Sequence, residues 1–177
     1  MRYTTIEDCH FVGAHATCLE AIQVGPTDAT TTEAHMDYCV IRRNRFDTWY
    51  GAASQFATAI KLGKKGELAT DQAHYFTGTT IENNDIFALT DGIVLNIVVD
   101  RGDFSVIRGN VIDSAEAANG CAASGITIEN EAKVMVVDNR INATDAIVTS
   151  SAMRTLANLV SNAGTPAGEN PIYSDST

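Results

Sequence analysis

Ile81-Glu82-Asn83-Asn84-Asp85-Ile86 is the stretch that decides the fold, because its pattern occurs five times along the chain. The shared phrase is an aliphatic residue, two variable residues, Asn, one variable residue and a large apolar residue. The other copies are Ile6-Glu7-Asp8-Cys9-His10-Phe11, Ile41-Arg42-Arg43-Asn44-Arg45-Phe46, Ile107-Arg108-Gly109-Asn110-Val111-Ile112 and Val136-Val137-Asp138-Asn139-Arg140-Ile141. The first copy carries Cys where the others carry Asn. Self-similarity at spacings of about 25 to 40 residues is typical of a repeat architecture.

A second strand signal follows each copy: a small residue and then alternating aliphatic residues. These segments are Ala21-Ile22-Gln23-Val24, Ala59-Ile60-Lys61-Leu62, Gly92-Ile93-Val94-Leu95, Gly125-Ile126-Thr127-Ile128 and Ala146-Ile147-Val148-Thr149. Alternation with a period of two, rich in β-branched residues, predicts strands. No stretch between them carries a convincing long helical period. Each repeat is therefore predicted to consist of two or three short strands joined by turns.

Repeats of this kind stack when equivalent residues lie over each other, about 4.8 Å apart, as in a parallel sheet. Three inward apolar columns are predicted: Ile6, Ile41, Ile81, Ile107 and Val136; Ile22, Ile60, Ile93, Ile126 and Ile147; and Phe11, Phe46, Ile86, Ile112 and Ile141. A fourth column consists of the asparagines of the phrase, Asn44, Asn84, Asn110 and Asn139. We expect them to stack at a turn, where Asn tolerates left-handed geometry and its amide can bond to the next amide.

The outward position after the first aliphatic residue alternates in charge. It is occupied in successive copies by Glu7, Arg42, Glu82 and Arg108. Opposite charges on neighbouring strands favour lateral pairing, although each exposed pair contributes at most about 1 kcal/mol. The alternation therefore supports the register of the repeats more than their stability.

The phrase and its asparagine column resemble the right-handed parallel β-helix family, which includes pectate-lyase-like proteins and phage tailspikes. The resemblance covers about residues 3–150 and implies an all-β solenoid of about five rungs, assigned here to residues 1–150. Residues 151–177 are expected to form a C-terminal cap and an extended arm. Because this fold hosts lyases, hydrolases and non-catalytic virion parts, the resemblance does not decide an activity.

The C-terminal segment has two parts with different compositions. Met153, Leu156 and Leu159 stand at helical spacing and fit a short cap across the last rung. From Ser161 the chain lacks the apolar content of a core and is predicted to be an extended arm. One interpretation is a disordered tail. The other is an arm that wraps a neighbour, with Ile172 and Tyr173 as its anchors.

Composition excludes several classes of partner and site. The chain of 177 residues has 12 basic and 22 acidic residues, a net charge of −10, which argues against nucleic acid or an anionic membrane as partner. No segment approaches the about 18 unbroken apolar residues of a membrane span, and the start shows no secretory signal. The four cysteines lack the spacing of a zinc site. No metal and no cofactor is expected.

Catalytic candidates are weak. The acids near the turn after the first strand, including Asp47, Asp85 and Asp113, could form a carboxylate pair, but are better interpreted as solvated turn residues. Lyases of the resembling family use Arg or Lys beside a bound Ca²⁺, and three arginines lie close together at Arg42, Arg43 and Arg45. The family's surrounding motif is not recognisable, and pairing with acids on adjacent repeats accounts for them better. No catalytic residue is predicted.

Two features predict contacts with other proteins. The first repeat begins within five residues of Met1, which leaves no room for an N-terminal capping helix and suggests that another surface covers this end. Apolar or neutral residues also occupy outward positions, which we interpret as an interface between copies, or alternatively as positions buried under the loops or tail. These candidates are Val94, Thr127, Val148, Val40, Val106 and Met135.

Together these features predict a non-catalytic structural protein of a virion, comparable to a phage capsid decoration or cement protein. It is expected to form a homotrimer, to bind a major capsid or other virion protein, and to be made in the host cytoplasm without a signal peptide. The alternative is a carbohydrate-active β-helix, either a polysaccharide lyase or hydrolase or a fragment of a tailspike.

Overall fold

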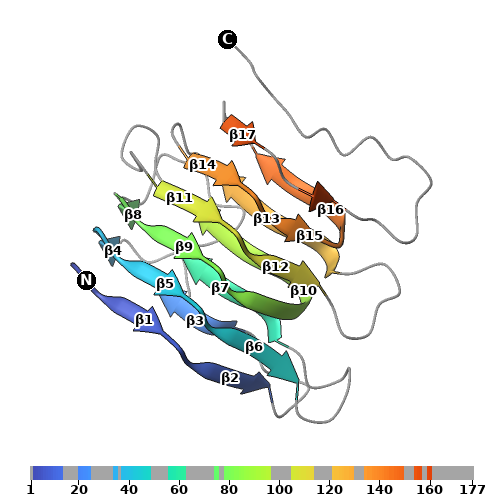
Figure 1. Ribbon diagram of the computed structural model, residues 1–177, viewed down its shortest axis with the longest axis horizontal. Helices are drawn as coiled ribbons and strands as arrows, with labels where there is room; N and C mark the ends of the chain where they lie inside the picture. The colour runs from blue at the N-terminus through green and yellow to red at the C-terminus, as the bar shows by residue number, and fades with distance from the viewer. Residues whose placement is uncertain are drawn as a thin grey trace.

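A computed structural model describes residues 2–13, 20–24, 34–35, 37–48, 56–62, 74–75, 78–96, 105–113, 121–129, 134–149, 154–156 and 159–160. The fold is all-β, and every strand pair that the structure describes is parallel. Strands of successive repeats lie side by side in chain order, from blue to red in Figure 1. The predicted all-β class with parallel strands is thus confirmed.

The first strand of each repeat belongs to a six-stranded sheet. In their order across the sheet, its strands are β1 (Thr5–Glu7), β5 (Val40–Arg42), β9 (Thr80–Glu82), β11 (Ser105–Arg108), β14 (Val134–Val137) and β17 (Arg154–Leu156). In β1, β5 and β9 the isoleucine of the phrase is the inward residue between two outward ones, and β11 and β14 alternate in the same way, with Ile107 and Val136 buried. This is the alternation that the phrase predicts.

The later strands of each repeat form a ten-stranded sheet. One row contains β2 (His10–Gly13), β6 (Arg45–Thr48), β10 (Asp85–Asn96), β12 (Val111–Asp113), β15 (Arg140–Ile141) and β18 (Leu159–Val160). The other contains β3 (Glu20–Val24), β7 (Phe56–Leu62), β10 again, β13 (Cys121–Glu129) and β16 (Ala143–Thr149). The long strand β10 joins the rows, because its start pairs with β6 and β12 and its end with β7 and β13. A separate pair joins β4 (Ala34–His35) and β8 (His74–Tyr75).

The registers confirm the three predicted apolar columns. Ile6 pairs with Ile41, Ile41 with Ile81, Ile81 with Ile107, and Ile107 with Val136. The Ile22 and Phe11 columns hold the same order as predicted. Because a slip of one residue would turn every side chain to the other face, this agreement establishes the register along the stack.

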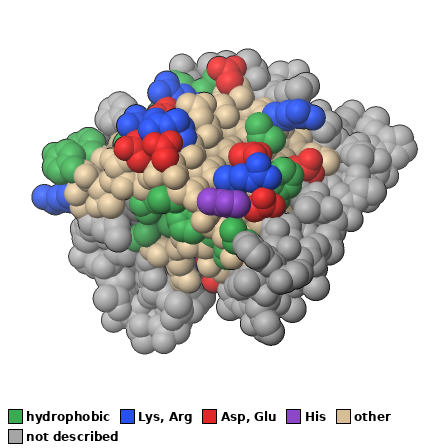
Figure 2. Space-filling view, turned by 60° about the horizontal axis from the view of Figure 1, so that its bottom comes forward, with side chains coloured by type: hydrophobic (Ala, Val, Ile, Leu, Met, Phe, Trp, Pro, Cys, Tyr) green, Lys and Arg blue, Asp and Glu red, His purple; other side chains and the backbone are tan. Residues whose placement is uncertain are grey.

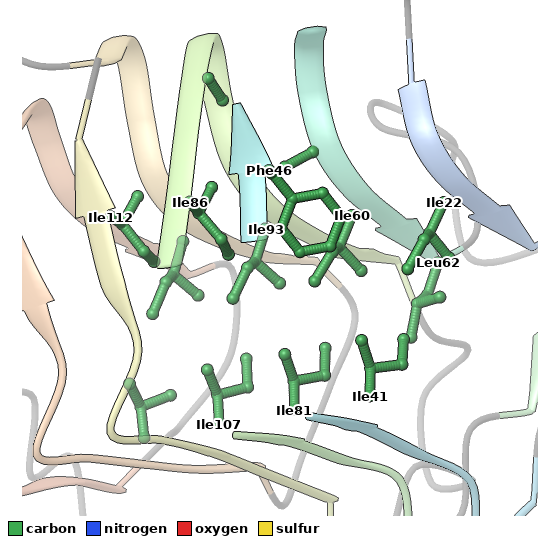
Figure 3. Packing of buried hydrophobic residues seen from close by; sticks show 14 of the residues in the cluster. Ile22, Ile41, Phe46, Ile60, Leu62, Ile81, Ile86, Ile93, Ile107 and Ile112 are labelled. Carbon is green, nitrogen blue, oxygen red and sulfur yellow. The ribbon is translucent and has the colours of Figure 1, made fainter. Parts of the chain in front are cut away.

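The core lies between the two large sheets. Figure 3 shows the row of Ile41, Ile81 and Ile107 facing a row that includes Phe46, Ile86 and Ile112. All six of these side chains are buried, with exposed fractions of 1% or less. Gly92 also lies in this region, where an added Cβ would stand 2.5 Å from Ile112 and 2.6 Å from the carbonyl oxygen of Gly125. The glycine that opens the second signal of the third repeat is therefore required by close packing.

The predicted helical cap is wrong for the residues that the structure describes. Leu156 ends β17 and Leu159 begins β18, and these strands pair with β14 and β15. In the sequence, Thr155-Leu156-Ala157-Asn158-Leu159-Val160 is a sixth, weakened copy of the phrase, with Thr155 in register with Val136. The repeats thus continue past residue 150, since pairing along an existing sheet edge satisfies more backbone groups than one helical turn. Met153, Ile172 and Tyr173 lie outside the described residues.

Candidate interaction surface

Buried asparagines connect neighbouring repeats in a hydrogen-bonded ladder. The Nδ2 group of Asn84 donates to the Oδ1 atom of Asn110 at 3.0 Å and to the carbonyl oxygen of Ile41 at 3.0 Å. The Oδ1 atom of Asn84 in turn accepts from the Nδ2 and backbone N–H groups of Asn44, at 3.1 and 3.0 Å. Asn110 repeats this pattern toward Asn139. Each amide thus satisfies buried groups of two neighbouring repeats, which is a strong constraint on register.

The left-handed turn residue is not the ladder asparagine, contrary to the expectation. Positive φ angles occur at the residue immediately before it, namely at Arg43, Asn83, Gly109 and Asp138, and at Asp8 before Cys9 in the first repeat. The reason is geometric. The ladder asparagines are at most 1% exposed and must point inward to bond their neighbours. The chain therefore reverses at the outward residue before each of them, where side chains other than glycine accept some strain.

The ladder ends at Cys9. Its backbone N–H group donates to the Oδ1 atom of Asn44 at 3.1 Å, as the Asn positions do, but its thiol turns back to the carbonyl oxygen of Glu7 at 3.2 Å. An asparagine here would offer an Oδ1 atom that no described residue could donate to. The cysteine is therefore suited to the position at which the column stops.

An ion-pair ladder lies on the outward side of the six-stranded sheet. The carboxylate of Glu82 accepts from Arg108 at 2.7 and 2.6 Å and lies 4.0 Å from Arg42. Arg42 also donates to Glu7 at 2.6 Å. The predicted lateral pairing of alternating charges is thus confirmed. Basic and acidic side chains gather in mixed clusters on the face shown in Figure 2.

The turn residues add a second pair at the first repeat. Arg43 donates to both carboxylate oxygens of Asp8, at 2.8 and 2.7 Å, and also to Glu7 at 3.0 Å. The hydrogen bonds from Arg43 hold the pKa of Asp8 below its ordinary value, and the same contact raises the pKa of Arg43. Both side chains stay charged at neutral pH. The arginines of the second repeat thus pair with acids, which was the interpretation favoured over a lyase base.

Two of the three acids considered for catalysis, Asp47 and Asp85, belong to a second cluster of charged side chains. Arg45 donates to Asp47 at 2.8 Å and lies 3.9 Å from Asp85. His10 lies 3.6 Å from the same carboxylate of Asp47. Asp113 stands elsewhere in the stack and accepts from Asn142 at 2.9 Å. The structure therefore brings Asp47 and Asp85 together around one arginine, and binds Asp113 to a neighbouring repeat.

The three outward candidates on the six-stranded sheet, Val40, Val106 and Met135, lie in one row with Thr80. Val40, Thr80, Val106 and Met135 occupy equivalent positions on adjacent strands. The first three are half-buried and Met135 is 43% exposed. We call this set the outward row. It joins three apolar side chains and Thr80 over four neighbouring strands, and an interface between copies would use such a strip.

The candidates on the third strands are placed differently. Thr127 is 1% exposed, and its hydroxyl lies 2.7 Å from that of Ser124. The alternative interpretation, burial within one chain, is therefore correct for Thr127. Thr127 is not part of the proposed interface. Val94 and Val148 pair with it in the predicted register, but their side chains lie outside the described part of the structure.

Stacked tyrosines at the first two repeats were not singled out from the sequence. The rings of Tyr3 and Tyr38 lie 5.5 Å apart and within 11° of parallel, with exposed fractions of 76% and 53%. Beside them Arg2 donates to Asp37 at 3.0 Å. These four residues line a hollow of about 280 Å³ and are called the tyrosine platform. The available signal was the matching Arg2-Tyr3 and Asp37-Tyr38 pairs, each three residues before a column isoleucine.

Backbone strain makes the platform unusual. Both tyrosines have φ of 53°, and the equivalent residue of the third repeat is Gly78, with φ of 63°. A Cβ at Gly78 would stand 2.7 Å from the ring of Tyr38, so the glycine makes room for that ring. A bulky residue at positive φ is strained, and such strain concentrates at functional positions.

Comparison with known proteins adds no relative to this picture. No family model, no curated protein and no solved structure matches the chain. Among the described residues, no group of three or more His, Cys, Asp or Glu side chains is arranged to hold a metal ion. The same part of the chain contains no helix long and apolar enough to cross a membrane.

Proposed function

We propose that the chain is a right-handed parallel β-helix that serves as a non-catalytic structural protein of a virion, of the capsid decoration or cement type. The outward row carries this proposal. Three half-buried residues and the exposed Met135 form a continuous strip across four strands, and a strip of this kind suits lateral contact between copies. A trimer about the long axis of the stack would bury one such strip per chain.

The fold assignment is supported by the topology. Equivalent strands of successive repeats pair in parallel and in chain order in each large sheet, as coils of a β-helix do. The virion assignment comes from the resemblance to β-helices of phage. A decoration protein stabilises a shell by many modest contacts across subunit junctions. A stack tied by buried amide and ion-pair ladders suits that task, because it resists bending between repeats.

The first repeat is the proposed docking end toward the larger shell. Ile6 and Phe11 are half-buried there, whereas Ile41 and Phe46, the next residues of their columns, are fully buried. Among the described residues, β1, β2 and β3 each pair with one neighbouring strand. Contact with a major capsid or other virion protein would cover this end of the core.

The test of self-association is the native mass of matched variants by light scattering after size exclusion. Met135→Asp places a charge in the outward row and should reduce a trimer to monomers. Val111→Asp is the control, because Val111 is similarly exposed at 37% but belongs to β12 of the other sheet. If both variants keep the mass of the parent protein, the outward row is not the interface.

The carbohydrate-active alternative is distinguished by activity. Asp47 and Asp85 share one outward cluster with His10 and Arg45, so a sugar could be bound beside them. On the proposed function, Asp47→Ala and Asp85→Ala leave the native mass unchanged, and no acidic polysaccharide is cleaved by the parent protein. Cleavage that either variant abolishes would favour the enzyme.

A further inference from the structure

The tyrosine platform is exposed without an evident role within its own chain. Tyr38 is stacked on Tyr3 on one side and lies against Gly78 on the other. Tyr3 is the outermost ring of this stack and is 76% exposed. A glycine or asparagine would adopt the same backbone geometry with less strain. The two tyrosines therefore cost conformational energy that a surface facing only water would not require. The arrangement therefore points to a binding partner that contacts the rings.

Size and charge narrow down the chemistry of that partner. The hollow of about 280 Å³ lies at the lower end of the usual range of ligand pockets, so it has room for a few side chains of a short segment. Arg2 has a side chain that is 73% exposed, whereas that of its partner Asp37 is 13% exposed. The platform thus offers a cation to solvent next to aromatic faces. It fits an extended segment that carries proline or aromatic residues together with carboxylates.

The chain itself contains such a segment. Residues 161–177 read Ser-Asn-Ala-Gly-Thr-Pro-Ala-Gly-Glu-Asn-Pro-Ile-Tyr-Ser-Asp-Ser-Thr. This arm sequence has Pro171, Ile172 and Tyr173 in succession, two acids at Glu169 and Asp175, and no Lys or Arg. We propose that Pro171-Ile172-Tyr173 of one copy binds the tyrosine platform of a second copy, with an arm carboxylate beside Arg2.

The lengths are compatible with this contact. The platform belongs to the first repeat and β18 to the sixth, so five strand spacings of about 4.8 Å, roughly 24 Å, separate the two ends of the stack. Twelve residues from Val160 to Ile172 span up to about 40 Å when extended. In a trimer of parallel chains, the arm can therefore cross to the platform of its neighbour. Contacts of this head-to-tail kind close into a ring when repeated around a threefold axis.

This inference rests on the proposed self-association and adds to it the residues that join one copy to the next. It is tested on the full chain by replacing Tyr173 with the photo-crosslinking residue p-benzoylphenylalanine. After irradiation, we expect a covalent dimer on a denaturing gel, and peptide mapping should join position 173 to Arg2, Tyr3 or Tyr38. Adding Tyr3→Ala should lower the dimer yield at least tenfold, whereas Tyr3→Phe should retain it. Met135→Asp is measured in parallel by native mass.

The outcomes separate the two proposals. A link from position 173 to the platform of the same chain, or to residues elsewhere, overturns the arm contact. A trimeric native mass without any link to the platform also overturns it but leaves the proposed function intact. A monomeric parent protein contradicts the proposed self-association itself. Equal dimer yields from Tyr3→Ala and Tyr3→Phe would show that the ring is not the binding group.

Discussion

The first repeat and the middle repeats carry the same phrase, but its residues are buried and hydrogen-bonded to different extents in the two regions. In the middle repeats, Ile81 and Ile86 are almost fully buried and Asn84 bonds to the repeats on both sides. In the first repeat, the equivalent Ile6 and Phe11 are half-buried, and Cys9 takes the place of the asparagine. A repeat protein obtains much of its stability from contacts between neighbouring repeats. A substitution in a repeat that has only one neighbour therefore removes fewer contacts. The comparison predicts that equivalent substitutions have unequal effects in the two regions.

The largest difference is expected in the Phe11 column. The rings of Phe11 and Phe46 are stacked with centroids 4.9 Å apart, but Phe46 is fully buried. Phe46→Ala should reduce the free energy of unfolding by about 3–5 kcal/mol, because it removes a buried ring and leaves a cavity. Phe11→Ala should cost about 1–2 kcal/mol, since part of that ring is already in water. Urea unfolding of both variants measures the difference, and equal losses would contradict it.

The asparagine ladder should show the next largest effect. Asn84→Ala removes the acceptor of two donors on Asn44 and a donor to Asn110, and should cost about 2–3 kcal/mol. Cys9→Asn extends the ladder by one amide at its end and should change stability by less than about 0.5 kcal/mol. Both are measured by the urea midpoint. A large gain in stability from Cys9→Asn would show that the column does not end at Cys9.

A smaller effect is expected in the ion-pair ladder. The side chain of Glu82 is 11% exposed and that of Glu7 is 37% exposed. Glu82→Gln weakens the contacts with Arg108 and Arg42 and should cost about 1–2 kcal/mol, because Glu82 is the better shielded acid. Glu7→Gln should cost less than about 1 kcal/mol. Repeating the unfolding in 1 M NaCl should reduce the effect at Glu7 more than that at Glu82.

The smallest effect concerns Asp8, which is exposed. Hydrogen bonds from Arg43 lower the pKa of Asp8 in the folded protein relative to the unfolded chain. Asp8 therefore contributes stability above its ordinary pKa, and this contribution is lost as the pH falls through the lower folded value. Asp8→Asn should destabilise the protein slightly at pH 7 and not at pH 2. Urea midpoints at the two pH values test this, with Asp138→Asn, the equivalent turn residue of the fifth repeat, as a control.

The sequence predicted the inward columns because one signal, the repeated phrase, determines both which residues pair and which face they occupy. In each of the three columns, every residue has the predicted partner on the next repeat. The columns run from Ile6 to Val136, from Ile22 to Ile147 and from Phe11 to Ile141. The sixth repeat was missed because Thr155 replaces the first aliphatic residue, and the spacing of Leu156 and Leu159 also fits a helix.

The outward residues were harder to predict. Strand alternation identified Thr127 as outward, but alternation alone does not tell whether the rest of the chain covers an outward residue, and Thr127 is 1% exposed. The strained position of each turn was assigned to the wrong residue, because Asn is favoured at left-handed positions and stands next to the true one. The tyrosine platform joins residues 35 positions apart whose proximity follows only once the register is known.

The native mass of the parent protein tests the central claim most directly. Light scattering after size exclusion, at micromolar concentration, should give a mass near three times the 18.9 kDa of one chain. That result would agree with a structural protein that associates through its outward row. A mass of one chain at every concentration measured would contradict the account, because the outward row would then have no partner in its own protein.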